Sequence, residues 1–210
     1  MKSVNFYNLS ILLVLTLLLY VPKLVAQEDK PGLINRLGIN IGVNFPVGSE
    51  VLRKGAYPIG LSLYLTATHI TSNRHNFELL AGADIIADYG GGIYLAMPGL
   101  VNWSYELIYI GNKRFIISNY AGLGYTFHHI YTRTEGIIVK NQHALGLDAG
   151  LIFNYALGKN WGVNLRTGVF HSFTSPVQAY YAGTSVTSEN KFNYTTFLLL
   201  IGFSRKIGKL

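Results

Sequence analysis

The sequence predicts an all-β protein, an antiparallel up-and-down transmembrane β-barrel of eight strands after an N-terminal signal peptide. Three observations lead to this prediction. Apolar and polar residues alternate in eight segments, the apolar faces of these segments carry no charge, and short connections alternate with long ones. In addition, only 13% of the residues are charged, whereas charged residues make up about a quarter of an ordinary soluble domain.

The N-terminus has the features of an export signal. Lys2 provides a positive start, an apolar run covers residues 9–21, and Ala26 offers a small residue at a cleavage point. This run is too short for a membrane-spanning helix, which needs about 20 apolar residues. An uncleaved N-terminal anchor is the alternative. We expect a signal peptide over residues 1–26, a short periplasmic segment over 27–36 and the barrel over 37–210.

The first four strand segments alternate with a period of two. In the first of them, Leu37, Ile39 and Ile41 share one face, and Gly38 and Asn40 share the other. Successive side chains of a strand point to opposite faces, so the pattern predicts one apolar and one polar face. The four segments are residues 37–45, 59–67, 77–85 and 101–109.

The last four segments continue the same pattern. Their apolar faces depart from aliphatic and aromatic residues only at Asn119, Thr167 and Thr195. These segments are residues 115–127, 145–155, 161–169 and 195–203.

The absence of charge from the apolar faces distinguishes a membrane barrel from a soluble one. The outer face of a soluble barrel is wet and carries Lys and Glu. In a membrane barrel, an Arg or Lys on the lipid face near the midplane costs about 2–4 kcal/mol. The other face is rich in glycine, which suits a narrow barrel whose strands bend sharply. The apolar faces are therefore predicted to contact lipid.

Connection lengths orient the predicted barrel. Outer-membrane barrels have short periplasmic turns and longer external loops. The short connections therefore predict the periplasmic side, which also holds both termini. The short connections are residues 69–75, 111–114 and 157–160, and the long ones are 46–58, 88–99, 128–142 and 171–193.

Three glycine-rich segments carry a family resemblance. Residues 37–45, 119–125 and 145–151 resemble strands of small eight-stranded outer-membrane proteins, most of all the OmpX- or PorT-like barrels of Bacteroidota. The resemblance implies a porin-like barrel in the outer membrane of a Gram-negative cell. Such families commonly end on an aromatic residue that the barrel-insertion machinery recognises. This chain departs from that pattern, because seven further residues, 204–210, follow Phe203.

Five charged residues fall on the predicted lumen face. Charges at membrane depth tend to face the interior and to pair. One interpretation is a polar plug that fills a narrow barrel. The other is a gated path for ions or small solutes, in which Arg166 switches between carboxylates such as Glu106 and Asp148. The five residues are Glu78, Asp84, Glu106, Asp148 and Arg166.

The histidines are candidates for metal ligands and for catalytic bases. His129 and His143 are predicted to face the same way on paired strands, but two ligands do not make a structural zinc site. We expect no metal and no cofactor. His171 and Ser172 are adjacent, so in a strand they point to opposite faces and do not form a nucleophile–base pair. A lipid-modifying enzyme is therefore an alternative that we do not favour.

The predicted function is non-enzymatic, with a structural role or a surface-binding role through the external loops. Tyr180 and Tyr181 in the predicted loop 171–193 are candidate binding residues, because exposed aromatics with small polar neighbours suit adaptable contacts. Expected partners are outer-membrane lipids and lipopolysaccharide, the insertion machinery during biogenesis, and an extracellular or periplasmic protein. Basic residues are dispersed, so no nucleic acid is expected, and we expect a monomer.

Overall fold

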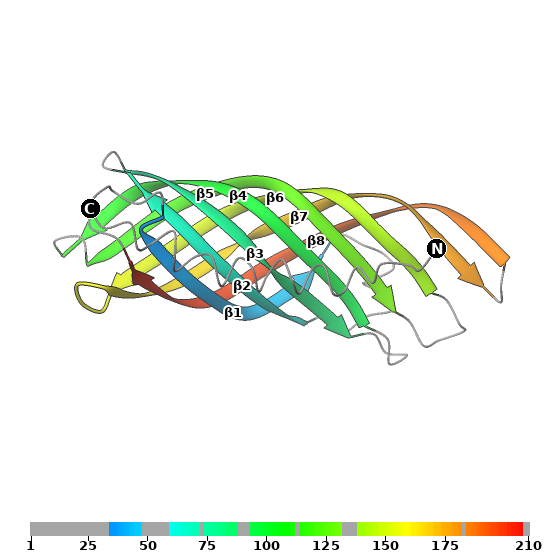
Figure 1. Cartoon of the computed structure of the whole chain (residues 1–210), viewed down its shortest axis with the longest axis horizontal. Helices are drawn as coiled ribbons and strands as arrows, with labels where there is room; N and C mark the ends of the chain where they lie inside the picture. Colours follow the sequence, from blue (N-terminus) through cyan, green and yellow to red (C-terminus); the bar gives the residue numbers. More distant parts are fainter. Residues whose placement is uncertain are drawn as a thin grey trace, which may run out of the picture.

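The computed structural model is a closed antiparallel barrel (Figure 1). It describes residues 34–47, 59–71, 74–87, 93–111, 114–131, 138–181 and 184–207, with the side chains of 130–131, 138–142, 174–181 and 184–193 left out of the description. The predicted signal peptide, residues 1–26, lies outside the described residues. The eight strands of the described part are β1 (Arg36–Pro46), β2 (Gly60–Ile70), β3 (His75–Ala87), β4 (Ile93–Ile110), β5 (Phe115–Tyr131), β6 (Ile138–Ala156), β7 (Trp161–Tyr181) and β8 (Thr184–Lys206).

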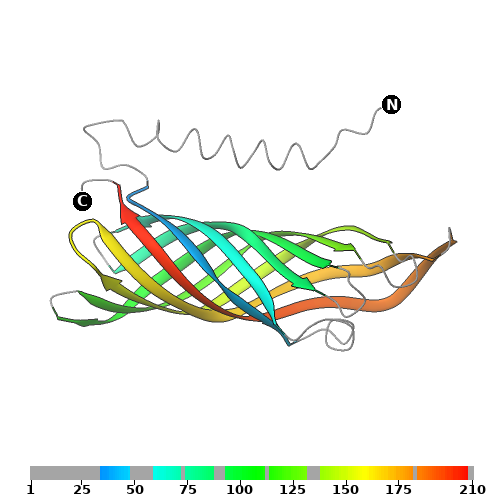
Figure 2. The same cartoon turned by 90° about the horizontal axis from the view of Figure 1, so that it is seen from below.

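Each strand pairs with the next along the chain, and β1 closes the barrel against β8. In that closing pair, Ile41 lies opposite Ile201 and Arg36 lies opposite Lys206. Figure 2 shows the strands tilted around the barrel axis. Closure leaves no free sheet edge at membrane depth, which hydrocarbon requires because it cannot satisfy backbone groups. The up-and-down eight-stranded fold predicted by the alternation is confirmed.

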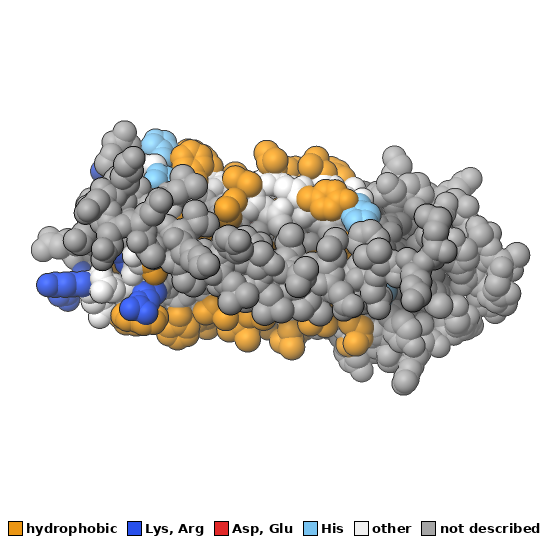
Figure 3. Space-filling view, viewed as in Figure 1, with side chains coloured by type: hydrophobic (Ala, Val, Ile, Leu, Met, Phe, Trp, Pro, Cys, Tyr) orange, Lys and Arg blue, Asp and Glu red, His pale blue; other side chains and the backbone are white. Residues whose placement is uncertain are grey.

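The two faces of the strands are as predicted. On β1, the Ile41 side chain is 62% exposed and Asn40 is 2% exposed. The same contrast recurs around the barrel, so the exterior carries a belt of exposed aliphatic and aromatic residues (Figure 3). Such a belt is stable in lipid rather than water. The described part of the chain contains no helix that is long and apolar enough to cross a membrane.

The prediction for the end of β4 is wrong in its phase. The register between β4 and β5 shifts between Glu106 and Ile108, so two consecutive residues, Leu107 and Ile108, are exposed at 43% and 49%. After this bulge the faces exchange, and the hydroxyl of Tyr109 donates to Glu106. A bulge inserts one extra residue into a strand and so reverses the alternation beyond it.

The three short connections are confirmed, but three of the four predicted external loops extend too far. Strand β4 begins at Ile93, β5 continues to Tyr131, and β6 begins at Ile138. The largest correction is at residues 171–193, where β7 and β8 continue as a hairpin and only residues 182–183 separate them. Beyond the bilayer the outer face no longer has to be apolar, so strands can continue without the alternation that predicts them.

Two lumen-facing glycines allow close approach of neighbouring strands. A Cβ atom at Gly42 would overlap the carbonyl oxygen of Leu199, and one at Gly150 would overlap that of Thr167. These contacts involve backbone, which cannot move aside as a flexible side chain does. The lumen-face glycines therefore set how tightly the barrel coils, as the sequence predicts for a narrow barrel.

Candidate functional site

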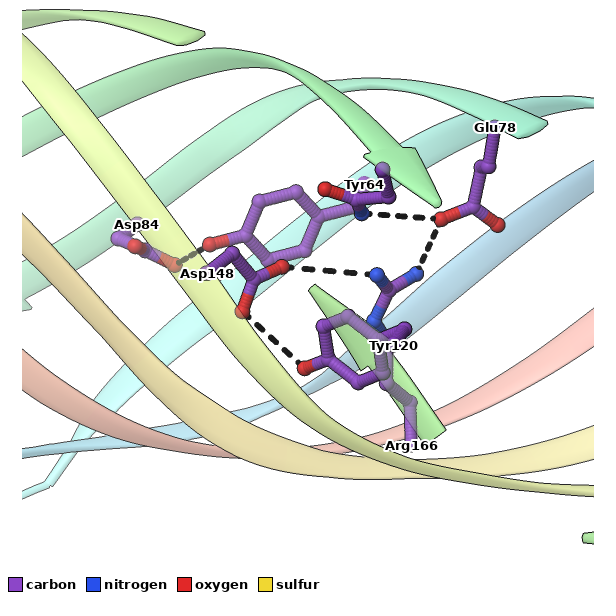
Figure 4. A network of polar contacts seen from close by, with 7 residues as sticks. Tyr64, Glu78, Asp84, Tyr120, Asp148 and Arg166 are labelled. Carbon is purple, nitrogen blue, oxygen red and sulfur yellow. Dashed lines mark hydrogen bonds and ion pairs between the residues drawn. The ribbon is translucent and has the colours of Figure 1, made fainter. Parts of the chain in front are cut away.

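The lumen holds a central ion-pair cluster built on Arg166 of β7 (Figure 4). Its Nη1 donates to Glu78 Oε1 of β3 at 2.6 Å, and its Nη2 lies 3.5 Å from Asp148 Oδ2 of β6. The guanidinium lies over the ring of Tyr120 with 4.0 Å to the centroid, a cation–π geometry. The Tyr120 hydroxyl in turn donates to Asp148 Oδ1 at 3.1 Å. Three of the five predicted lumen charges thus form one cluster.

Glu106 belongs to a different cluster, nearer the short-turn end. Its Oε1 accepts from Asn76 Nδ2 at 3.2 Å, and its Oε2 accepts from the Tyr109 hydroxyl at 2.5 Å. The predicted exchange of Arg166 between Glu106 and Asp148 therefore does not match the arrangement, because the partners that Arg166 contacts are Glu78 and Asp148. The bulge in β4 turns Tyr109 toward Glu106, so Glu106 has a partner within its own strand.

Asp84 forms a third cluster, toward the opposite end of the lumen. Its Oδ1 accepts from Ser62 Oγ at 2.5 Å and from the Tyr64 hydroxyl at 2.6 Å, and Ser62 Oγ accepts from Asn44 Nδ2 at 2.9 Å. All four residues are buried. Asp84 is therefore held by neutral donors, away from Arg166. Tyr64 and Tyr120 were not predicted as site residues, although their positions on the polar face of two strands are visible in the sequence.

An aromatic layer closes the lumen beyond Asp84. The rings of Tyr94 and Tyr194 lie 4.9 Å apart, and Phe170 and His128 pack against Tyr194 at 5.9 and 5.5 Å. Each of these side chains is buried. We call these four residues the aromatic layer. It fills the half of the lumen away from the short turns with side chains, as an eight-stranded barrel allows.

The aromatic layer contains a histidine–serine contact that was not predicted from the sequence. His128 Nε2 lies 2.7 Å from Ser172 Oγ, and His128 Nδ1 hydrogen-bonds to the Tyr94 hydroxyl. His171, by contrast, faces outward and pairs with Thr195 Oγ1, so the predicted separation of His171 from Ser172 is confirmed. His128 and Tyr120 are an even number of residues apart on β5 and therefore share a face. The place of His128 in the lumen could thus have been predicted from the sequence.

The remaining predicted site residues lie outside these clusters. His143 lies opposite Phe127 and stacks on Tyr125 at 5.4 Å, an aromatic contact that was not predicted. Tyr180 and Tyr181 lie in β7, paired through the backbone with β8, and not in a loop. Their side chains lie outside the described residues.

A polar cavity lies on the short-turn side of Arg166. It has a volume of about 50 Å³, more than one water molecule needs. Its walls include Glu78, Glu106 and Arg166 together with Arg36, which was not predicted to reach the lumen. We call it the inner cavity. The lumen is therefore hollow on the short-turn side of the ion-pair cluster and packed on the opposite side.

The comparisons with known proteins agree with this architecture. No family model and no curated protein sequence matches the chain. Among solved structures, the chain is similar to Neisserial surface protein A, with a TM-score of 0.52 and 12% identity over 81% of this chain and 96% of that one. It is also similar to a major outer membrane protein from Thermus thermophilus, with a TM-score of 0.53 and 16% identity over 81% and 98% of the two chains.

These likenesses show the fold. The exposed apolar belt indicates that this fold is stable in lipid. The finer resemblance to OmpX- or PorT-like barrels of Bacteroidota stays a prediction. The chain has the fold of the small eight-stranded β-barrels of outer membranes.

Proposed function

We propose that this barrel is a closed, non-enzymatic anchor whose function is surface binding, and that the binding element is the projecting hairpin of β7 and β8. The observation that carries the proposal is the unequal length of the strands. β1 and β2 have 11 residues each, whereas β7 has 21 and β8 has 23. About 9–11 residues suffice for a tilted strand to span the bilayer. The last two strands are therefore longer than anchoring alone requires.

The backbone of β8 offers an edge for strand addition. Its pairing with β1 ends at Thr196, opposite Pro46, with one further bond from the Val47 amide to the Thr195 carbonyl. From Thr184 to Tyr194, β8 pairs with β7 and, among the residues that the structure describes, with no other strand. Figure 1 shows this hairpin reaching beyond the other strands. An unpaired edge is a template for an extended segment of a partner.

The packed external half of the lumen supports binding rather than transport. A pore needs a continuous wet path, and the aromatic layer fills this path with buried side chains. The partner we infer is an extracellular protein with an extended segment, because another β-strand would satisfy the backbone groups on the unpaired edge of β8.

The test is an in-register shortening of the hairpin. Residues 174–192 are replaced by Asn-Gly, which joins the register partners Phe173 and Asn193 through a two-residue turn. We expect heat-modifiable migration, and hence barrel folding, to persist. A photo-cross-linking residue at position 187 in the intact chain should give a defined adduct in cells, and the same residue at position 161, at the opposite end, should not give that adduct. The absence of adducts at positions 185, 187 and 189 would contradict the proposal.

A narrow gated pore is the second candidate, favoured by the inner cavity that reaches Arg166. A pore predicts discrete conductance in planar bilayers that changes on Arg166→Ala. Our proposal expects the intact chain to be silent in that measurement.

Because His128 contacts Ser172, the enzymatic alternative is tested by one activity assay. His128 belongs to the aromatic layer, and both side chains are buried, where a lipid substrate does not reach them. Expression of the chain should leave lipid A acylation unchanged. A changed acylation pattern that is lost in Ser172→Ala would identify an enzyme and overturn the non-enzymatic part of the proposal.

A further inference from the structure

The short-turn end of the barrel opens into a second cavity, which we call the mouth cavity. It has a volume of about 160 Å³ and shares Arg36, Asn154 and Ser204 with the inner cavity. Four basic residues line it: Arg36, Arg114, Lys159 and Lys206. Among the described residues that line it, none is acidic. Figure 3 shows Lys and Arg side chains gathered at this end of the barrel.

Two of the four cations face each other directly. Arg36 begins β1 and Lys206 ends β8, and the two residues are register partners in the closing strand pair. Both side chains are half-buried, and both line the mouth cavity. Like charges placed directly opposite on neighbouring strands destabilise a sheet. The carboxylate of Glu106, in the inner cavity, offsets part of the charge of Arg36 but not that of the other three cations. An anion in the mouth cavity would reduce the remaining repulsion, so this arrangement favours a negatively charged ligand.

The interior of the barrel confines such an anion to the mouth. The carboxylates of Glu78 and Glu106 line the inner cavity, just beyond the mouth cavity. An anion that moved further inward would meet these negative charges. Neutral groups on Asn154, Asn160 and Ser204 line the mouth cavity and offer hydrogen bonds. The volume is several times what one water molecule requires, which leaves room for a tetrahedral oxyanion.

We propose that the mouth cavity binds a phosphate group, as a phosphate ester or as inorganic phosphate, with Arg36 and Lys206 as its principal ligands. Arginine offers a planar fork of donors to oxyanions, and lysine adds a compact point charge. Several cations around one cavity suit a group that carries more than one negative charge. The phosphate has two sources at this end of the barrel: a lipid headgroup of the inner leaflet, or a soluble phosphate from the periplasm.

The first arm of the experiment uses inorganic phosphate. The chain is refolded in dodecyl maltoside, a detergent without phosphate, and titrated with phosphate by calorimetry. The double variant Arg36→Gln, Lys206→Gln should bind about tenfold more weakly or not at all, since it loses two charge-assisted contacts. The matched control is Arg205→Gln, which removes one positive charge beside Lys206. Arg205 faces outward over the Trp161 ring at 5.3 Å, so its loss should leave phosphate affinity unchanged.

The second arm separates the lipid source from the soluble source. Native mass spectrometry measures whether the chain in the same detergent retains phosphatidylglycerol. Retention that the double variant loses, without binding of free phosphate, assigns the cavity to a lipid headgroup. Binding of free phosphate without lipid retention assigns it to a soluble ligand.

Stability measurements distinguish a loss of phosphate binding from a loss of folding in the double variant. The urea midpoint of the intact chain should rise with added phosphate, because a ligand that binds only the folded state stabilises it. The double variant should be at least as stable as the intact chain without phosphate, since it lacks the repulsion, and should not respond to phosphate. No binding in either arm, or equal loss of binding in Arg205→Gln, would overturn the proposal.

Discussion

Arg166 on β7 and Glu78 on β3 join opposite walls of the barrel, with 2.6 Å between Nη1 and Oε1. Their strands are not neighbours in the sheet, so this ion pair crosses the lumen. Its arrangement with Asp148 and Tyr120 satisfies charges that the bilayer interior would otherwise penalise. The cluster therefore joins the two walls by polar contacts inside the lumen. It does so at the same depth as the apolar belt on the outside of the barrel.

Breaking this pair should destabilise the barrel strongly. Arg166→Leu leaves the buried carboxylate of Asp148 and the partly buried carboxylate of Glu78 without their cation. It is expected to lower the free energy of unfolding by about 3–5 kcal/mol. Urea unfolding in lipid vesicles measures the change. The double variant Glu78→Leu, Arg166→Leu should cost less than the sum of the single variants, because removing both charges leaves fewer unpaired groups. Simple additivity would show that the two residues are not coupled.

A charge on the lipid face should impair insertion according to its depth. Leu147 lies in the exposed belt of β6, and Leu157 lies in the turn that follows the same strand. Leu147→Arg is expected to cost about 2–4 kcal/mol, and Leu157→Arg about 0–1 kcal/mol near the interface. Folding yield into vesicles and the urea midpoint measure the effect of each substitution. Equal tolerance of the two substitutions would contradict the assignment of the lipid face.

A methyl group added at Gly150 should strain the barrel wall. Its Cβ would overlap the carbonyl oxygen of Thr167, so the strands β6 and β7 would have to separate. We expect Gly150→Ala to cost about 1–3 kcal/mol, the range for overpacking. Gly158→Ala is the control, because nothing lies within 4 Å of that position. If the two variants unfolded at the same urea concentration, the close approach of β6 and β7 at Gly150 would not determine the stability of the barrel.

The aromatic layer is expected to be the barrier to conduction. Tyr94→Ala combined with Tyr194→Ala removes two packed rings from the half of the lumen away from the short turns. The intact chain should be silent in planar bilayers, and the double variant should show discrete openings together with lower stability from the cavity created. Tyr155→Ala, on the exposed face, should stay silent. Conductance of the intact chain would mean that the layer does not close the lumen.

Much of the fold followed from the sequence. The alternation from Leu37 onward assigned each strand and its two faces, and exclusion of charge from one face identified lipid as its environment. The alternation does not predict the faces after Glu106, where a bulge reverses them, or the course of the chain beyond residue 171, where β7 continues to Tyr181. In both places the local pattern carries no information about the register that neighbouring strands impose.

The sequence by itself therefore determined the class of fold, the membrane-facing surface and five of the lumen charges, because period and charge exclusion are local properties of each strand. Only the tertiary structure decided which charges meet. Arg166 contacts Glu78 across the lumen, and Arg36 faces Lys206 at the mouth, because barrel closure and strand stagger bring together residues far apart in the chain. Pairing across a closed barrel depends on register and tilt, and no single strand encodes them.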